Sequence, residues 1–302
     1  GDAIYKRLQV NIADISDSNA LYFVETQVIT SAETTPATRA NNVSYRQVTF
    51  TPGSATASVV GPTYTEQPAI FAWRDHGNGI GMPDAGVLIV EATIPMDGII
   101  HVGSKATDLG EGSLWKYTYA IHNQNSSQEL GWIEHSTGHK GEAHSFDFNG
   151  VEYHDDIDGL ISASDWTRYL AVCDTLVNWY AQGFPVDPFA NGIRWGTTYG
   201  FSFITSSEPK NELFYGMSVG YDTAAGSNGD PYFLYDIDAI SPLQGEFCND
   251  CLPDLNDDGS LDFFDVSVFL ADFAAGGDYN GDGETNFFDI SFFLSDFNAG
   301  CP

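Results

Sequence analysis

The chain has little positive charge. It carries 11 Lys and Arg against 42 Asp and Glu in 302 residues, for a formal net charge of -31. Such a charge repels phosphate backbones, so the composition excludes nucleic-acid binding. Long apolar runs are also absent: the stretch from Val87 to Val90 is far shorter than the ~18 residues that a membrane span needs. We therefore expect no nucleic-acid partner and no membrane span.

The remaining composition fits a folded, exported protein. Apolar residues make up 42% and aromatic residues 14% of the chain, which excludes wholesale disorder. The first residue is Gly1 rather than Met, no basic and apolar leader is present, and Lys occurs five times. These features match a mature product after removal of an export signal, and a trimmed sequence would look the same. We expect a secreted protein, extracellular or on the cell surface.

The composition changes near residue 246, which predicts two domains. From residue 246 to 302 there are 13 acidic residues and no Lys or Arg, while residues 1–245 hold every basic side chain. We therefore expect a large domain over 1–245 and a small, different domain over 246–302.

The second domain contains a duplicated acidic motif. Residues 254–265 are repeated 24 residues later as 278–289, and both copies have Gly at the sixth position. A calcium loop takes oxygen ligands from positions 1, 3, 5, 7, 9 and 12 and needs that Gly for its sharp turn. The predicted calcium ligands are Asp254, Asn256, Asp258, Ser260, Asp262 and Asp265 in the first copy, and Asp278, Asn280, Asp282, Glu284, Asn286 and Asp289 in the second, with the main-chain carbonyl used at Ser260 and Glu284.

These loops predict two bound Ca²⁺ ions. A solvated acidic tail is the alternative, but such a tail would not place Gly twice in register or continue into Phe-rich helical segments. Without a cation the ligand carboxylates would repel one another at close range, so we expect this domain to fold only with calcium.

Two EF-hand-like loops that end in Asp rather than Glu, each followed by one helix, resemble a dockerin domain. The resemblance covers roughly residues 251–302. It implies a calcium-loaded module that docks onto a protein partner, commonly a cohesin domain, with residues at loop positions 10 and 11 helping to select that partner. Those positions are more apolar here than the hydroxyl-bearing pairs of many dockerins; the predicted partner-binding residues are Phe263, Phe264, Phe287 and Phe288.

Helical periodicity separates a core stripe from other apolar residues in this domain. The stripes, with i, i+3, i+4, i+7 spacing, are Val266, Phe269, Leu270 and Phe273, then Ile290, Phe293, Leu294 and Phe297. The apolar residues off the stripes are Phe264, Val268, Phe288 and Phe292. They either pack on the large domain or form a surface for a partner.

The four cysteines form an even set, which favours disulfides in an exported protein. Cys251 and Cys301 bracket the two loops, so we expect the pair Cys251-Cys301, which leaves Cys173-Cys248 as the second pair. Sequence alone permits three pairings.

The large domain is predicted to be mainly β. Short segments rich in Val, Ile, Thr, Tyr and Phe are separated by Gly, Pro, Asn or Ser turns, which indicates an antiparallel β-sandwich or jelly roll. One helix is predicted over 164–180, with Ser164 as its N-cap. The predicted strands cover 3–12, 20–29, 45–51, 69–73, 86–93, 98–102, 115–123, 131–134, 145–148, 199–204, 212–221 and 231–240.

Residues 110–240 also resemble an uncharacterised β domain of secreted environmental bacterial proteins that often accompanies such dockerins. The similarity rests on residues 115–125 and 191–203, which frame Tyr153-His154-Asp155 and Asp165-Trp166. The resemblance implies no known reaction and no catalytic residues.

Motifs for catalysis are lacking. The densest group of metal-capable side chains surrounds His135, His139, His144 and His154, without the spacing of a zinc site. We therefore predict a secreted, non-catalytic structural protein whose calcium-bound module joins it to a partner or a neighbouring copy, as in an extracellular fibre, with the strand at 3–12 available to pair with a sheet edge. The alternative is a dockerin-borne enzyme or binding protein that acts on polysaccharide.

Overall fold

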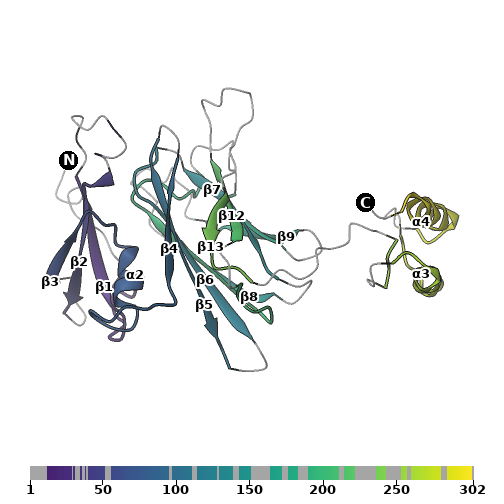
Figure 1. The fold of residues 1–302 in the computed structure, drawn as a ribbon, viewed down its shortest axis with the longest axis horizontal. Helices are drawn as coiled ribbons and strands as arrows, with labels where there is room; N and C mark the ends of the chain where they lie inside the picture. The colour runs from purple at the N-terminus through teal and green to yellow at the C-terminus, as the bar shows by residue number, and fades with distance from the viewer. Residues whose placement is uncertain are drawn as a thin grey trace.

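The computed structural model is mainly β, as the pattern of short strands and turns predicted, and contains three antiparallel sheets (Figure 1). It describes residues 12–28, 30, 35, 38, 40–51, 56–94, 97–110, 114–127, 129–138, 143–150, 164–171, 176–182, 190–210, 214–221, 236–242, 253–256, 260–279 and 284–300. The strands are β1 (Tyr22–Gln27), β2 (Val43–Phe50), β3 (Ala57–Thr65), β4 (Leu88–Thr93), β5 (Ile99–Asp108), β6 (Trp115–Asn123), β7 (Leu130–Ser136), β8 (His144–Asn149), β9 (Thr167–Ala171), β10 (Leu176–Tyr180), β11 (Thr198–Thr205), β12 (Phe214–Tyr221) and β13 (Asp236–Ala239).

Each sheet has a simple strand order. The first has three strands, β1-β2-β3; the second, which we call the middle sheet, has the order β4-β5-β6-β11-β8. The third, the far sheet, has the order β13-β12-β7-β10-β9. A short helix, α2 (Phe71–His76), follows the first sheet, and together they form the N-terminal layer.

The hydrophobic core lies between the middle and far sheets. In β6 alternate residues Tyr117, Tyr119 and Ile121 are fully buried, which is the period-2 pattern of a strand with one face on a core. From the far sheet, Trp179 packs on Phe201 of the middle sheet with ring centroids 5.4 Å apart. Burial of these large aromatic side chains supplies most of the driving force for folding.

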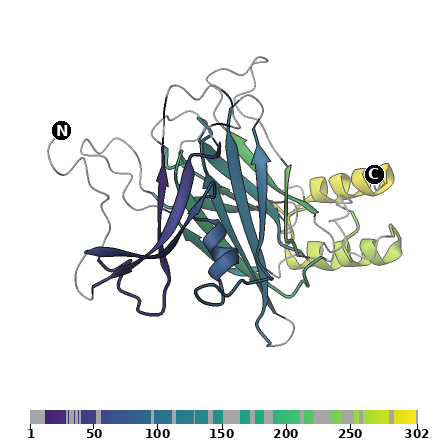
Figure 2. The same ribbon diagram turned by 60° about the vertical axis from the view of Figure 1, so that its left-hand side comes forward.

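The N-terminal layer covers the opposite face of the middle sheet (Figure 2). Gly103 of β5 points to that face, and a Cβ atom there would lie 3.0 Å from the ring of Trp73 in α2. The absence of a side chain at Gly103 therefore lets the helix approach the sheet closely.

Two predicted elements are wrong. The helix predicted over 164–180 is instead the antiparallel hairpin of β9 and β10, with Leu176 paired to Ala171. Its aromatic and β-branched residues suit a strand. Pairing of β10 with β7 favours the strand over the helix for this segment. The strand predicted over 69–73 overlaps helix α2, while β3 was not predicted at all.

Some predictions fall outside the described residues. These are the strand at 3–12, apart from Ile12, and both disulfides, since Cys173, Cys248, Cys251 and Cys301 are not described. Among the described helices, none combines the length and the apolar character that a membrane crossing requires.

Candidate functional site

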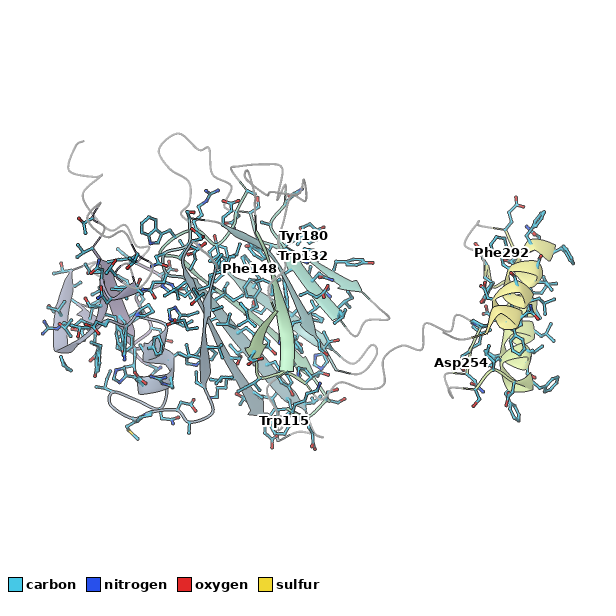
Figure 3. The ribbon with its side chains drawn as sticks, turned by 45° about the horizontal axis from the view of Figure 1, so that its top comes forward. Trp115, Trp132, Phe148, Tyr180, Asp254 and Phe292 are labelled. Carbon is cyan, nitrogen blue, oxygen red and sulfur yellow. The ribbon has the colours of Figure 1, made fainter. Side chains whose placement is uncertain are left out.

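The repeated C-terminal segment forms two matching helices, α3 (Phe263–Ala275) and α4 (Phe287–Ala299). Figures 1 and 3 show them apart from the three sheets. Each begins with the same capping box: the side chain of Asp262 or Asn286 accepts a hydrogen bond from a first-turn amide, at 2.7 Å in both cases. In return, Asp265 or Asp289 accepts from the backbone amide of the cap residue. The repeat in sequence is therefore a repeat in local structure.

The two helices pack through one aromatic pair. Phe269 and Phe293 are buried and lie in parallel, with ring centroids 4.1 Å apart. Tyr279 packs edge-on against both rings, at 5.7 and 5.5 Å, and its hydroxyl donates to Asp296. The predicted core stripe is thus correct at these two phenylalanines.

Four predicted ligands of the first loop are connected through Asp265. This carboxylate is fully buried and accepts from the backbone amides of Asn256 at 3.2 Å and Asp262 at 2.9 Å. The side chain of Asp254, which is also buried, forms a hydrogen bond with it. The first, third, ninth and twelfth positions of the loop therefore meet at one buried carboxylate.

The second loop repeats part of this arrangement. Asp289 is fully buried and accepts from the backbone amide of Asn286 at 2.7 Å. Asp278 and Glu284, like Ser260 of the first loop, are exposed. The predicted ligands Asp258, Asn280 and Asp282 lie outside the described residues, within which no group of three His, Cys, Asp or Glu side chains is arranged to hold a metal ion.

The chemistry of the loop residues fits a hard divalent cation. Burial disfavours the charge on Asp265, but the backbone amides of Asp262, Asn256 and Leu255 outweigh this effect and lower its pKa. An ionised, buried carboxylate beside a second one suits calcium, which prefers such oxygen ligands. No Lys or Arg occurs between residues 246 and 302 to neutralise them.

The predicted partner-binding residues form the most exposed apolar surface of the helical pair. Phe263, Phe264, Phe287 and Phe288 are 74%, 64%, 72% and 63% exposed. Val268 and Phe292 are exposed as well, so they do not pack on the sheets. Leu270 and Leu294, predicted to be core, are instead 52% and 54% exposed, because the contact centred on Phe269 and Phe293 does not cover them.

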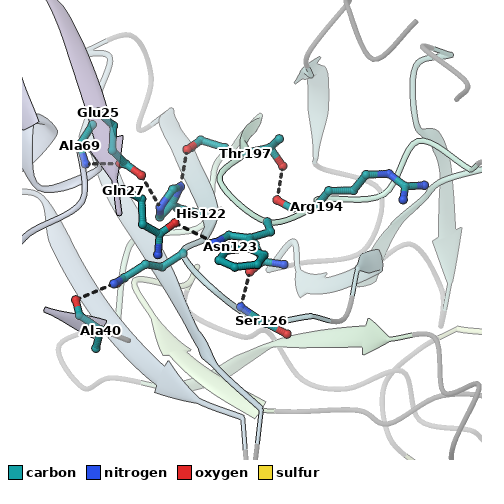
Figure 4. A network of polar contacts seen from close by, with 12 residues as sticks. Glu25, Gln27, Ala40, Ala69, His122, Asn123, Ser126, Arg194 and Thr197 are labelled. Carbon is teal, nitrogen blue, oxygen red and sulfur yellow. Dashed lines mark hydrogen bonds and ion pairs between the residues drawn. The ribbon is translucent and has the colours of Figure 1, made fainter. Parts of the chain in front are cut away.

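A second polar site, which the sequence did not reveal, crosses the middle sheet on the face toward the N-terminal layer; Figure 4 shows the part of it where Glu25 meets His122. The strand register places Glu91 opposite His101, His101 opposite His122, and His122 opposite Thr198. We call these four residues the histidine row. Glu91 Oε2 lies 3.6 Å from His101 Nε2, and Thr198 Oγ1 lies 2.9 Å from His122 Nδ1.

The N-terminal layer meets this row through Glu25 of β1. One oxygen of its carboxylate, Oε1, lies 3.5 Å from His122 Nε2, and the other accepts from the backbone amide of Ala69 at 2.6 Å. Gln27, also in β1, accepts from the indole N–H of Trp195 at 2.7 Å. The ring of Phe71 in α2 packs edge-on against His101. We call the contact made by the histidine row, Glu25, Gln27, Phe71 and Trp195 the seam.

The seam contains titratable groups whose pKa values are shifted by burial. Burial lowers the pKa of His101 to about 4, and burial together with the neighbouring His101 lowers that of His122 to about 3. Burial raises the pKa of Glu25, although the Ala69 amide opposes the rise. At neutral pH both histidines are therefore uncharged.

Alternation along β5 and β6 was the only available signal for these residues, since a histidine in an apolar strand usually occupies a core position. The histidine group considered from sequence is not a site in the described chain. His135 is buried in the core beside Tyr119, whereas His144 is exposed, and His139 and His154 are not described.

No protein-family model matches the chain, and none of the curated proteins matches it.

Proposed function

We propose that the chain is a secreted, non-catalytic structural protein whose C-terminal module, loaded with two Ca²⁺ ions, joins it to another protein. In this proposal residues 1–245 form a β domain in which the middle and far sheets make a β-sandwich, and residues 246–302 form a dockerin-like module. The partner is a cohesin-like domain or a neighbouring copy of the chain.

The proposal rests above all on the exposed phenylalanine pairs at the start of α3 and α4. Exposed apolar clusters of this kind mark interaction surfaces in soluble proteins, because water contact with them is costly. The pairs 263–264 and 287–288 occupy equivalent positions, the tenth and eleventh of the two predicted loops, where α3 and α4 begin. A ligand that orders the loops would therefore also fix these side chains.

Bound calcium would supply positive charge between the loop carboxylates. Asp254, Asp262 and Asp265 would hold it in the first loop, and Asp278 and Asp289 in the second. The same Asp265 and Asp289 carboxylates close the capping boxes of the helices, so loop order and helix order are coupled.

Isothermal titration of the metal-stripped full chain with CaCl₂ tests the calcium sites. We expect two ions to bind, and Asp265→Asn and Asp289→Asn each to remove or strongly weaken one. Asp272→Asn, on the exposed part of α3 outside the loops, is the matched control and should retain both. The calcium module would be refuted if the chain bound no calcium, or if neither loop substitution changed the binding.

Sedimentation velocity with and without calcium, and titration against a purified cohesin domain, test the docking surface. We expect calcium-dependent association in one of these experiments, either of the chain with itself or of the chain with cohesin. The double variant Phe263→Ser/Phe287→Ser should abolish that association. Ile80→Ser, which alters an exposed apolar side chain outside the module, should leave it unchanged. If the chain stays monomeric in saturating calcium and does not bind cohesin, neither proposed partner is correct.

A further inference from the structure

We propose that the seam is an acid-released contact: on acidification the N-terminal layer separates from the middle sheet, while the core between the middle and far sheets stays folded. This inference concerns residues outside the calcium module and does not depend on the function proposed for it.

The N-terminal layer is built as a separable part. Among the described residues, the main hydrophobic cluster joins the middle and far sheets and contains no residue of β1, β2, β3 or α2. The layer has its own buried residues, among them Val43, Tyr45 and Ala72. Its connection to the middle sheet includes the seam, the packing of Ile70 and Trp73 over Gly103, and a hydrogen bond from the Gln124 side chain to the Ala40 carbonyl.

The seam buries two histidines without full hydrogen bonding. Within the described chain, Nδ1 of His101 and Nε2 of His122 have no hydrogen-bond partner although both atoms are shielded from water. The two rings lie 6.2 Å apart, so a proton on each would bring two positive charges close together in a poorly solvated place. Separation of the layer would expose both rings to water and relieve that cost.

Every charged group near the two rings can be identified in the described elements. Glu25 of β1 faces His122, and Glu91 of β4 faces His101 with a side chain that is more than half exposed. In α2, Arg74 lies 4.9 Å over the ring of Phe71 and is paired with Asp75, so this helix adds an ion pair beside the seam and no net charge from these two residues. On β11, Thr198 is uncharged.

The direction of the pH effect follows from proton binding. The docked histidines, with pKa values of about 4 and about 3, bind fewer protons between pH 6.5 and 4 than the same groups in water, so acid favours separation. Glu25 acts in the opposite direction, because its raised pKa lets the docked state keep a proton. Because two histidines favour separation in acid and one carboxyl opposes it, acidification favours separation overall.

In the intact calcium-loaded chain, the indole N–H of Trp195 reports on the seam and the indole N–H of Trp166 reports on the core. Trp195 donates to Gln27 across the seam, whereas Trp166 is buried in the core and donates to the Asn191 carbonyl. We would follow both signals by ¹H–¹⁵N NMR of tryptophan-labelled protein from pH 7.5 to 3.5, assigning Trp195 with Trp195→Phe. The Trp195 signal should move to the position of a water-exposed indole at a higher pH than any change in Trp166.

Variants identify the groups responsible. In His101→Gln with His122→Gln, the midpoint for Trp195 should fall by about one pH unit or more. Glu25→Gln should raise it, because the docked state loses its counter-charge. His144→Gln, which alters an exposed histidine, should change neither signal. If the double variant does not fold, the shift of the Trp195 midpoint in Glu25→Gln tests the proposal by itself. Simultaneous movement of Trp195 and Trp166, or an unchanged midpoint in the variants, would overturn the proposal.

Discussion

Histidine burial is the most distinctive feature of the protein at the level of single residues. His76, His101, His122 and His135 are each at most 3% exposed. His135 lies in the main core, with its ring centroid 4.2 Å from that of Tyr119, and burial lowers its pKa to about 4. Such a group contributes stability that is fully present above pH 6.5 and is lost as the pH falls toward 4, because the unfolded chain binds the proton first.

We expect this loss to be measurable at His135. Between pH 7 and pH 5 its contribution to the free energy of unfolding should fall by about 2 kcal/mol. Urea denaturation at both pH values should therefore show a smaller decrease for His135→Gln than for the parent. His144→Gln is the control and should behave like the parent. Equal decreases in the parent and His135→Gln would show that the fold does not lower the pKa of His135.

The two aspartates that end the loops serve more than one purpose at the residue scale. Asp265 and Asp289 are buried and close the capping boxes of α3 and α4 through the Asp262 and Asn286 amides. An acidic residue in the first helical turn is ordinary capping chemistry. Calcium binding is therefore proposed from the whole twelve-residue pattern and not from these caps alone.

At the scale of elements, helix α2 depends on small residues in the middle sheet. Gly103 and Gly200 both lie in that sheet, in β5 and β11. A Cβ atom at Gly103 would meet the Trp73 ring at 3.0 Å, whereas one at Gly200 would have its nearest neighbour at 3.6 Å, an ordinary contact distance. Gly103 therefore lies against Trp73 of α2, whereas the nearest neighbours of Gly200 belong to Asn149 and Tyr119 of the same sheet.

Alanine substitution distinguishes the two glycines. Gly103→Ala should lower the free energy of unfolding by roughly 1 kcal/mol, because Trp73 must shift to make room for the methyl group. Gly200→Ala should be neutral or slightly stabilising, since alanine restricts the unfolded chain. Thermal or urea unfolding of the full chain measures both. A larger loss at Gly200 than at Gly103 would contradict the packing of α2 described above.

At the scale of the whole molecule, like charge opposes folding. A net charge of -31 produces repulsion that salt screens over a distance of about 10 Å at 0.1 M. We expect the melting temperature of the calcium-saturated protein to rise by several degrees between 20 mM and 500 mM NaCl. The rise should shrink near pH 4, where many carboxyls are protonated. A melting temperature that falls with salt at pH 7 would show that specific ion pairs outweigh the repulsion.

The sequence by itself determined the features that depend on neighbours in the chain. Strand β6 lies at the predicted residues 115–123, and both C-terminal helices begin at the phenylalanine pairs near the end of each loop. The buried pair Phe269 and Phe293 also follows from helical spacing. Alternation, capping residues and turn glycines act over a few residues, so they can be read without the fold.

Tertiary structure decided the rest, because its energies come from residues far apart in the chain. Residues 167–171 and 176–180 form strands because β7 offers a pairing edge to β10, and the exposure of Leu270 reflects how little of each helix the other covers. The seam shows this most clearly: Glu25 meets His122, 97 positions later, only because one layer packs across the other. Burial, and with it the charge of each histidine, is a property of that packing and not of the local sequence.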